Sequence, residues 1–380
     1  AATDLGVEGL GLGVAVAVPT VRGGAESTEP GPGAWAMRDG DIKAIRVILG
    51  GGYEIADRVA FGASAHLVRS TWVARVDTDT LPDLAAAIEA EGQETHYTDA
   101  DLEHPDYAAT LQFDELSDIA VSWSAGVRVE VDPGIAIGIA YVHGAAIDNT
   151  GGVAIQFGCP PESDTTGRYA AERAGTCYAT VDADASVAYT LPGRVQGGVS
   201  WEPTPAWTLS ALGGVVFWSV YDDFTITVSN PDIASEEGRE LIEQSRKWAR
   251  ANVDSGWGGL DVKARPTEQW TVGGRLLYDA AAVPTEALST NNYDANAWML
   301  SALAAWRPVP TLEIGASWTH HFLADRAVET SGFSQTLEGT PPEDRWNYPH
   351  AAGAYGGVID RIGVAARLHF GGGERGGAKR

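Results

Sequence analysis

The chain has 380 residues, with 51 acidic and 26 basic side chains and a net charge of −25. A surface this acidic repels polyanions, which excludes nucleic acid as a partner. Although 44% of the residues are hydrophobic, no run of 18 apolar residues occurs, so the sequence contains no candidate transmembrane helix.

Short and long connections alternate along the chain. Five short ones contain proline or charged residues that end strands. Long polar connections lie between them, and this asymmetry is typical of an outer-membrane barrel with short periplasmic turns and long extracellular loops. The short connections are residues 55–58, 131–134, 202–205, 264–269 and 307–310, and the long ones are roughly residues 19–40, 77–112, 158–177, 229–252, 280–293 and 325–354.

Residues 77–118 carry 13 carboxylates and no lysine or arginine. We interpret this stretch as a solvated acidic loop that includes a short helix over Leu81–Glu91. Divalent cations that bridge such loops to anionic lipid headgroups remain an alternative. The sequence indicates no other cofactor and no metal site.

The segments between the connections alternate apolar and polar residues, as strands with one oily and one wet face do. They include residues 119–130, 181–189, 207–217, 312–319 and 361–370. We expect each apolar face to contact lipid and each polar face to line the lumen, which makes Asp182 and Asp184 lumen residues. The lumen candidates either pair in a wall network or anchor a carboxylate; they are Arg128, Glu130, Arg275, Glu313, Arg361 and Arg367.

Cys159 and Cys177 are the only cysteines, and they bracket one polar loop. An isolated pair of this kind indicates a disulfide formed in an oxidising compartment such as a periplasm. Closing a loop of this length contributes on the order of 3 kcal/mol in the chain-entropy model.

Residues 231–251 predict a second loop helix, because Asn230 is a suitable N-cap, Pro231 is a favourable first residue and basic residues gather toward its end. Its apolar side chains would cover the barrel mouth. There they either pack against a neighbouring loop or contact a ligand; they are Ile233, Leu241, Ile242 and Trp248.

Trp270–Asp279 shows the strand alternation most clearly. Its apolar face begins with Trp270 and ends with Tyr278, as in strands with an aromatic residue at each bilayer interface. We therefore predict an all-β fold, a transmembrane antiparallel β-barrel in the bacterial outer membrane, with about 12 visible strands, or about 14 if an N-terminal part is missing. Residues 1–370 would form this single domain, followed by a glycine-rich tail over residues 371–380.

Four stretches carry a likeness to a known family. Tyr189–Trp201 contains a leucine-proline strand element, Phe217–Phe224 contains W-S-V-Y-D, Trp270–Pro284 is a strand and loop that end in proline, and Tyr355–Phe370 closes the barrel. Together they resemble the FadL-type outer-membrane transporters of long-chain fatty acids and other hydrophobic compounds. The resemblance implies passive transport of a fatty acid or an aromatic hydrocarbon by a barrel in contact with membrane lipid and lipopolysaccharide.

The sequence departs from that family in three ways. The family's N-terminal plug and first two strands have no counterpart, since Gly11–Pro19 is most similar to the third strand, and residues 371–380 follow the last one. The loops are also strongly acidic, which disfavours capture of fatty-acid anions and favours neutral hydrophobic ligands.

The sequence does not indicate an enzyme. His320 and His321 are adjacent in a strand, point to opposite faces and therefore cannot bind one metal ion. Neither a catalytic triad nor a phosphate loop is marked in the sequence. Two alternatives to hydrophobic transport remain, namely a structural barrel whose acidic loops dock a surface protein partner, and a general porin.

Overall fold

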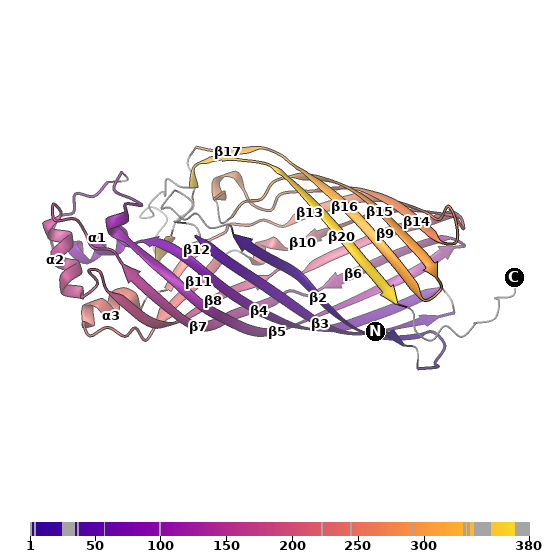
Figure 1. Cartoon of the computed structure of the whole chain (residues 1–380), viewed down its shortest axis with the longest axis horizontal. Helices are drawn as coiled ribbons and strands as arrows, with labels where there is room; N and C mark the ends of the chain where they lie inside the picture. Colours follow the sequence, from indigo (N-terminus) through magenta and orange to yellow (C-terminus); the bar gives the residue numbers. More distant parts are fainter. Residues whose placement is uncertain are drawn as a thin grey trace.

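The computed structural model describes residues 2–3, 5–24, 35, 38–56, 58–98, 100–221, 223–243, 245–289, 292–329, 332, 335–337 and 351–368. The strands run along an elongated molecule, and the helices α1 (Leu81–Ala90), α2 (Thr165–Ala174) and α3 (Glu236–Ile242) gather at one end (Figure 1). We call this end the head. Each of the five short connections joins two neighbouring antiparallel strands, as predicted.

Away from the head, 12 strands pair side by side, each antiparallel to its neighbour, in agreement with the expected number. Within the described residues no pairing joins the first of these strands to the last. They pair in the order β2 (Leu10–Gly24), β3 (Asp39–Ile55), β4 (Val59–Asp79), β5 (Ala108–Asp132), β6 (Ile135–Val142), β9 (Arg194–Thr204), β10 (Trp207–Val216), β13 (Ser255–Ala264), β14 (Trp270–Asp279), β15 (Ala297–Val309), β16 (Leu312–Leu323) and β20 (Val358–Leu368).

The same sheet continues into the head through β4 and β5. There β5 pairs with β7 (Ala145–Phe157), followed in order by β8 (Thr180–Leu191), β11 (Asp223–Ser229), β12 (Ser245–Ala249) and β18 (Gln335–Leu337). The strands β7, β8, β11 and β12 continue the lines of β6, β9, β10 and β13 across short interruptions. Gly144 lies at one interruption, where a Cβ would stand 2.4 Å from the Leu191 carbonyl oxygen, so a side chain is excluded.

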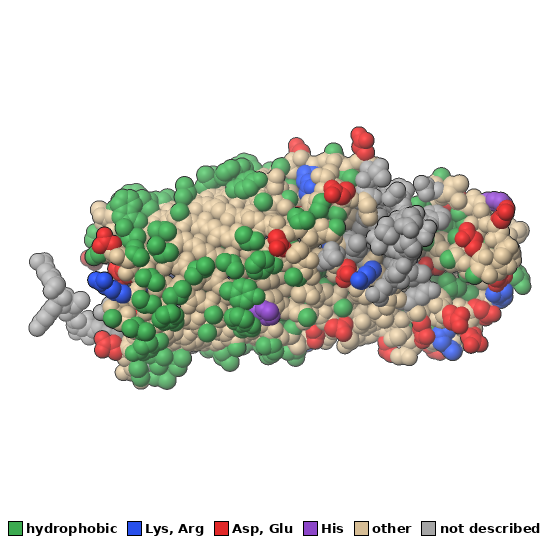
Figure 2. All heavy atoms as spheres, turned by 180° about the vertical axis from the view of Figure 1, so that it is seen from behind, with side chains coloured by type: hydrophobic (Ala, Val, Ile, Leu, Met, Phe, Trp, Pro, Cys, Tyr) green, Lys and Arg blue, Asp and Glu red, His purple; other side chains and the backbone are tan. Residues whose placement is uncertain are grey.

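The wall away from the head is apolar on its outer face. Leu276 is 45% exposed there, whereas Thr271 and Arg275 lie on the opposite face of β14. Trp270 stacks on Trp306 at one end of this face, with ring centroids 6.1 Å apart, and aromatic rings also pair at its other end. Figure 2 shows hydrophobic side chains spread over this half and acidic ones most frequent toward the head. These faces are the ones predicted for a membrane-spanning wall.

The head has the opposite polarity. The apolar face of β8 is buried in a core between the strands, and Asp182 and Asp184 are exposed. The expectation that this apolar face contacts lipid while both aspartates face the lumen is therefore wrong. The reason is that β8 lies outside the apolar band, where water surrounds the wall and hydrophobic side chains turn inward.

One predicted loop helix is confirmed and the other is largely wrong. The helix expected at Leu81–Glu91 is α1. Of residues 231–251, only seven form α3, whose N-cap is Ser235 and not Asn230. Farther along this segment, β12 (Ser245–Ala249) pairs with β11 on one side and β18 on the other, and this sheet pairing overrides the helical propensity of its residues.

The remaining elements are short. Among the residues described, no helix is long and apolar enough to cross a membrane. The predicted glycine-rich tail, residues 371–380, lies outside the described part of the chain. The short elements are β1 (Ala2–Thr3), β17 (Arg326–Val328), β19 (Gly353–Tyr355) and the 3-10 turns Pro105–Tyr107, Trp218–Val220 and Thr285–Ala287.

Candidate transport site

A narrow cavity lies in the head, between the ends of the strands and the three helices. Its volume is about 80 Å³, and we call it the head cavity. The wall is mostly apolar because the inward-facing residues of β4, β5, β7 and β11 belong to the head core. Apolar wall residues include Val76, Leu84, Leu111, Ile226, Leu241 and Ile242.

An ion pair forms the polar part of this wall. The guanidinium of Arg246, on β12, donates to the carboxylate of Asp83, on α1. Burial raises the pKa of Asp83, while the guanidinium beside it acts in the opposite direction. The pair joins helix to sheet and leaves the two charges mutually neutralised.

A second buried carboxylate fixes the start of α1. Asp79 accepts hydrogen bonds from the backbone N–H groups of Leu81 at 2.9 Å and Glu103 at 2.8 Å. Burial raises the pKa of Asp79 to about 6. This carboxylate therefore holds two loop segments against the head cavity, at the cost of being charged in a buried position.

Stability of the head should depend on the titration of Asp79. Because its folded-state pKa lies above the usual 3.8, the folded protein retains a proton that the unfolded chain has released, so stability falls as pH rises from about 4 to about 6. The loss should be on the order of 2–3 kcal/mol. Urea unfolding followed by tryptophan fluorescence at several pH values measures it. Asp79→Asn should flatten this window, and an unchanged pH dependence in that variant would contradict the assignment.

The helix α2 is tied to the rest of the head by its N-cap. One carboxylate oxygen of Asp164 accepts from the backbone N–H of Gly167 at 2.9 Å. The other accepts from the hydroxyls of Tyr97 at 2.7 Å and Tyr107 at 2.6 Å. Burial and the adjacent carboxylate raise the pKa of both phenols, which keeps them protonated as donors.

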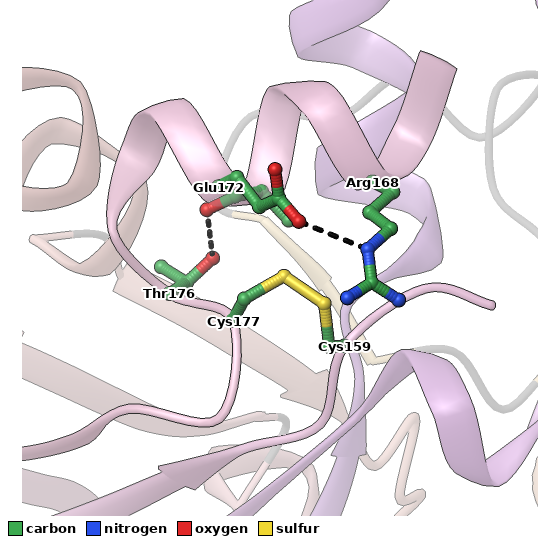
Figure 3. Close-up of a disulfide and its surroundings, with 6 residues drawn as sticks. Cys159, Arg168, Glu172, Thr176 and Cys177 are labelled. Carbon is green, nitrogen blue, oxygen red and sulfur yellow. Dashed lines mark hydrogen bonds and ion pairs between the residues drawn. A yellow bond between two sulfur atoms is a disulfide. The ribbon is translucent and has the colours of Figure 1, made fainter. Parts of the chain in front are cut away.

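A disulfide between Cys159 and Cys177 closes the loop that carries α2, as predicted (Figure 3). Beside it, Arg168 donates to Glu172 at 2.9 Å. The hydroxyl of Thr176 donates to the carbonyl of Ala171 at 3.2 Å. The covalent link thus confines a short helix directly beside the head cavity, whose wall includes Thr176.

A larger cavity of about 860 Å³ occupies the barrel interior away from the head, and we call it the chamber. Glycines on several strands leave it wide; at Gly126 a Cβ would stand 2.9 Å from the Ile139 carbonyl oxygen. Arg128 and Arg275 contribute charged side chains to its wall. Arg275 forms two hydrogen bonds of 2.7 Å with Asp261, its cross-strand neighbour.

The other lumen candidates lie on inward-facing strand positions but do not form one cluster. Glu130 shares a face with Arg128 on β5. Glu313 interacts with Arg307 at 2.8 Å and with Arg367 at 3.5 Å. Arg361 pairs in register with Thr319 on the same inner face. His320 bonds Asp360 at 2.9 Å on the outer face while His321 is buried, so the two histidines point apart as expected.

The structure separates the four apolar candidates of residues 231–251. Leu241 and Ile242, in α3, line the head cavity. Ile233 packs against the head core. Trp248 is part of β12, and its side chain lies outside the described residues.

Sequence reasoning missed polar residues of the interior on β3, β4 and β9. They are Arg46, His66 and Arg194, which lie near one another. The ring of His66 is hydrogen-bonded to the hydroxyl of Ser64 at 2.7 Å. A visible signal was the single basic residue in the apolar run Ile45-Arg46-Val47, which marks an inward position.

Comparison with known proteins identifies the family of this chain. A family model described as outer membrane protein transport protein (OMPP1/FadL/TodX) matches residues 7–352. The chain belongs to this family. No curated protein matches it.

Solved structures share the fold of this family member at low sequence identity. A FadL homologue of Pseudomonas aeruginosa has a TM-score of 0.70 at 14% identity, over 95% of this chain and 74% of that one. The toluene transporter TodX of Pseudomonas putida has a TM-score of 0.62 at 12% identity, over 96% and 80%. The toluene transporter TbuX of Ralstonia pickettii has a TM-score of 0.58 at 14% identity, over 95% and 78%.

Family membership and the apolar outer wall together establish the general role of this FadL-type chain. It is a β-barrel of the bacterial outer membrane that transports hydrophobic molecules, and it is not an enzyme. Membrane lipid surrounds the apolar band.

Proposed function

We propose that this FadL-type barrel carries neutral hydrophobic compounds and that the head cavity is where such a compound first binds. Support comes from the wall of the cavity, where apolar side chains from four strands and three helices converge. A small number of polar groups in an apolar cleft is typical of sites for small hydrophobic ligands.

The charges of the cavity wall support a neutral ligand over a fatty-acid anion. Arg246 is already occupied by Asp83. The remaining charged wall residue is Asp106, which repels a carboxylate. A neutral hydrocarbon meets no such repulsion and gains by leaving water.

Uptake by cells tests this proposal. Cells that express the chain should accumulate an alkylbenzene faster than cells without it. Expression should increase the uptake rate of a long-chain fatty acid by a smaller factor. Leu241→Trp should slow alkylbenzene uptake because the larger ring fills the head cavity. Leu260→Trp is the matched control, because Leu260 is exposed on the outer wall.

Three results would change the assignment. Faster uptake of the fatty acid than of the alkylbenzene would reverse the proposed substrate class. Rapid swelling of liposomes in small sugars would identify a general porin. Uptake of neither compound class would favour the structural role in which the loops dock a surface partner.

A further inference from the structure

The barrel interior between the head cavity and the chamber is filled by aromatic rings. Along β4, Ala60, Gly62 and Ser64 line the chamber, and Val76 and Thr78 line the head cavity. Trp72 lies between the two on the same inward face. Any solute that moves from one cavity to the other inside the barrel must therefore pass this level. We call its rings the aromatic constriction: Trp72, Phe113, Tyr189, Tyr221 and Phe224.

Two contacts of the constriction cross the interior from wall to wall. The rings of Trp72, on β4, and Phe224, on β11, have centroids 5.6 Å apart. The hydroxyls of Ser70, on β4, and Tyr189, on β8, are hydrogen-bonded at 2.9 Å. Since β5 and β7 separate β4 from β8 and β11 in the sheet, these contacts span the lumen.

Three of the rings at this level are almost completely buried. Trp72, Phe113 and Phe224 are 2%, 1% and 3% exposed. The rings of Trp72 and Phe113 are 4.7 Å apart, and Tyr189 stacks on Phe224 at 5.7 Å. A hydrated solute would have to lose most of its water shell to pass between these rings.

Two observations distinguish the constriction from an ordinary core. Among the residues that the structure describes, the indole N–H of Trp72 has no hydrogen-bond partner although it is buried, which is unfavourable in a fixed core. The wall that carries Tyr221 and Phe224 is also interrupted, because strand pairing stops between Val216 and Asp223 and is interrupted again between β12 and β13.

We propose that the aromatic constriction is the specificity-determining element of transport. A hydrophobic solute passes by displacing Phe224 and Tyr221 from Trp72 and by contacting the ring faces itself, whereas hydrated solutes are stopped. Trp72, Phe113 and Phe224 are the residues that set this preference. The inference rests on the proposed function, since it assigns the step that follows binding in the head cavity.

Opening the constriction should admit hydrated solutes. Liposomes that contain Phe224→Ala should swell several-fold faster in a small sugar than liposomes that contain the unaltered protein. The swelling rate with Phe224→Leu should lie between these two. Phe322→Ala is the matched control, because Phe322 is exposed on the outer wall and lines neither cavity. Heat-modified mobility on a gel verifies that each barrel is folded. A folded Phe224→Ala barrel that remains impermeable to sugar overturns the proposal.

Locking the constriction provides a second test that does not depend on the stability of the alanine variant. In the double variant Trp72→Cys/Phe224→Cys, joining the two thiols with a bifunctional reagent should abolish alkylbenzene uptake. The same reagent should not abolish uptake by Trp72→Cys or Phe224→Cys alone. The native cysteines are disulfide-bonded and do not react. Undiminished uptake after cross-linking overturns the proposal. Failure of the proposed function is distinguishable, because the unaltered protein would then take up no alkylbenzene while sugar swelling still reports on the constriction.

Discussion

Replacing Arg246 by methionine is expected to lower the free energy of unfolding by about 3–5 kcal/mol, because it leaves the carboxylate of Asp83 buried without its partner. Part of this loss should be recovered at acidic pH, since a protonated Asp83 is tolerated better in a buried position. Urea unfolding followed by tryptophan fluorescence measures the change.

The double variant Asp83→Leu/Arg246→Met is the control for the buried pair. It should recover most of the lost stability, because it removes both charges and keeps an apolar wall. A double variant as unstable as Arg246→Met alone would show that the loss comes from packing and not from the unpaired charge.

Leu276→Arg is expected to impair insertion into lipid far more than Thr271→Arg. Leu276 is exposed on the outer apolar face of β14, where an arginine near the bilayer midplane costs about 2–4 kcal/mol. Thr271 lies on the inner face of the same strand, where an arginine remains hydrated. Folding yield into liposomes, read from heat-modified mobility, compares the two variants. Equal yields would mean that the faces of β14 are reversed or that this wall does not contact lipid.

The membrane-spanning wall could be predicted because each residue there faces one of two very different solvents. In β14 the period of two follows directly from lipid outside and a wet lumen inside. In β8 the same period is present, but it identifies only which residues share a face. Whether that face is outer or inner depends on the position of the strand along the barrel, which Val181 and Asp182 do not encode locally.

The pairings inside the barrel were less predictable because they depend on strand register. Arg275 was recognised as a lumen residue, but its partner Asp261 could be identified only after β13 and β14 were aligned. Likewise, residues 245–249 have a helical composition, and pairing with strands distant in sequence makes them β12. The short helix α2 did carry local signals, namely Asp164 at its N-cap and Gly175 at its end.

The inverted polarity of the head constrains the order in which this chain assembles. The head strands continue strands of the membrane wall, so their charged residues, such as Asp182 and Asp184, must cross the hydrocarbon before water can surround them. A finished head would have to carry its charged shell and its buried ion pair through lipid at once. We therefore expect the hairpins to cross in an extended form and the rings of Trp72 and Phe224 to meet only afterwards. On this expectation, the last part of the molecule to be completed is the one that closes its interior.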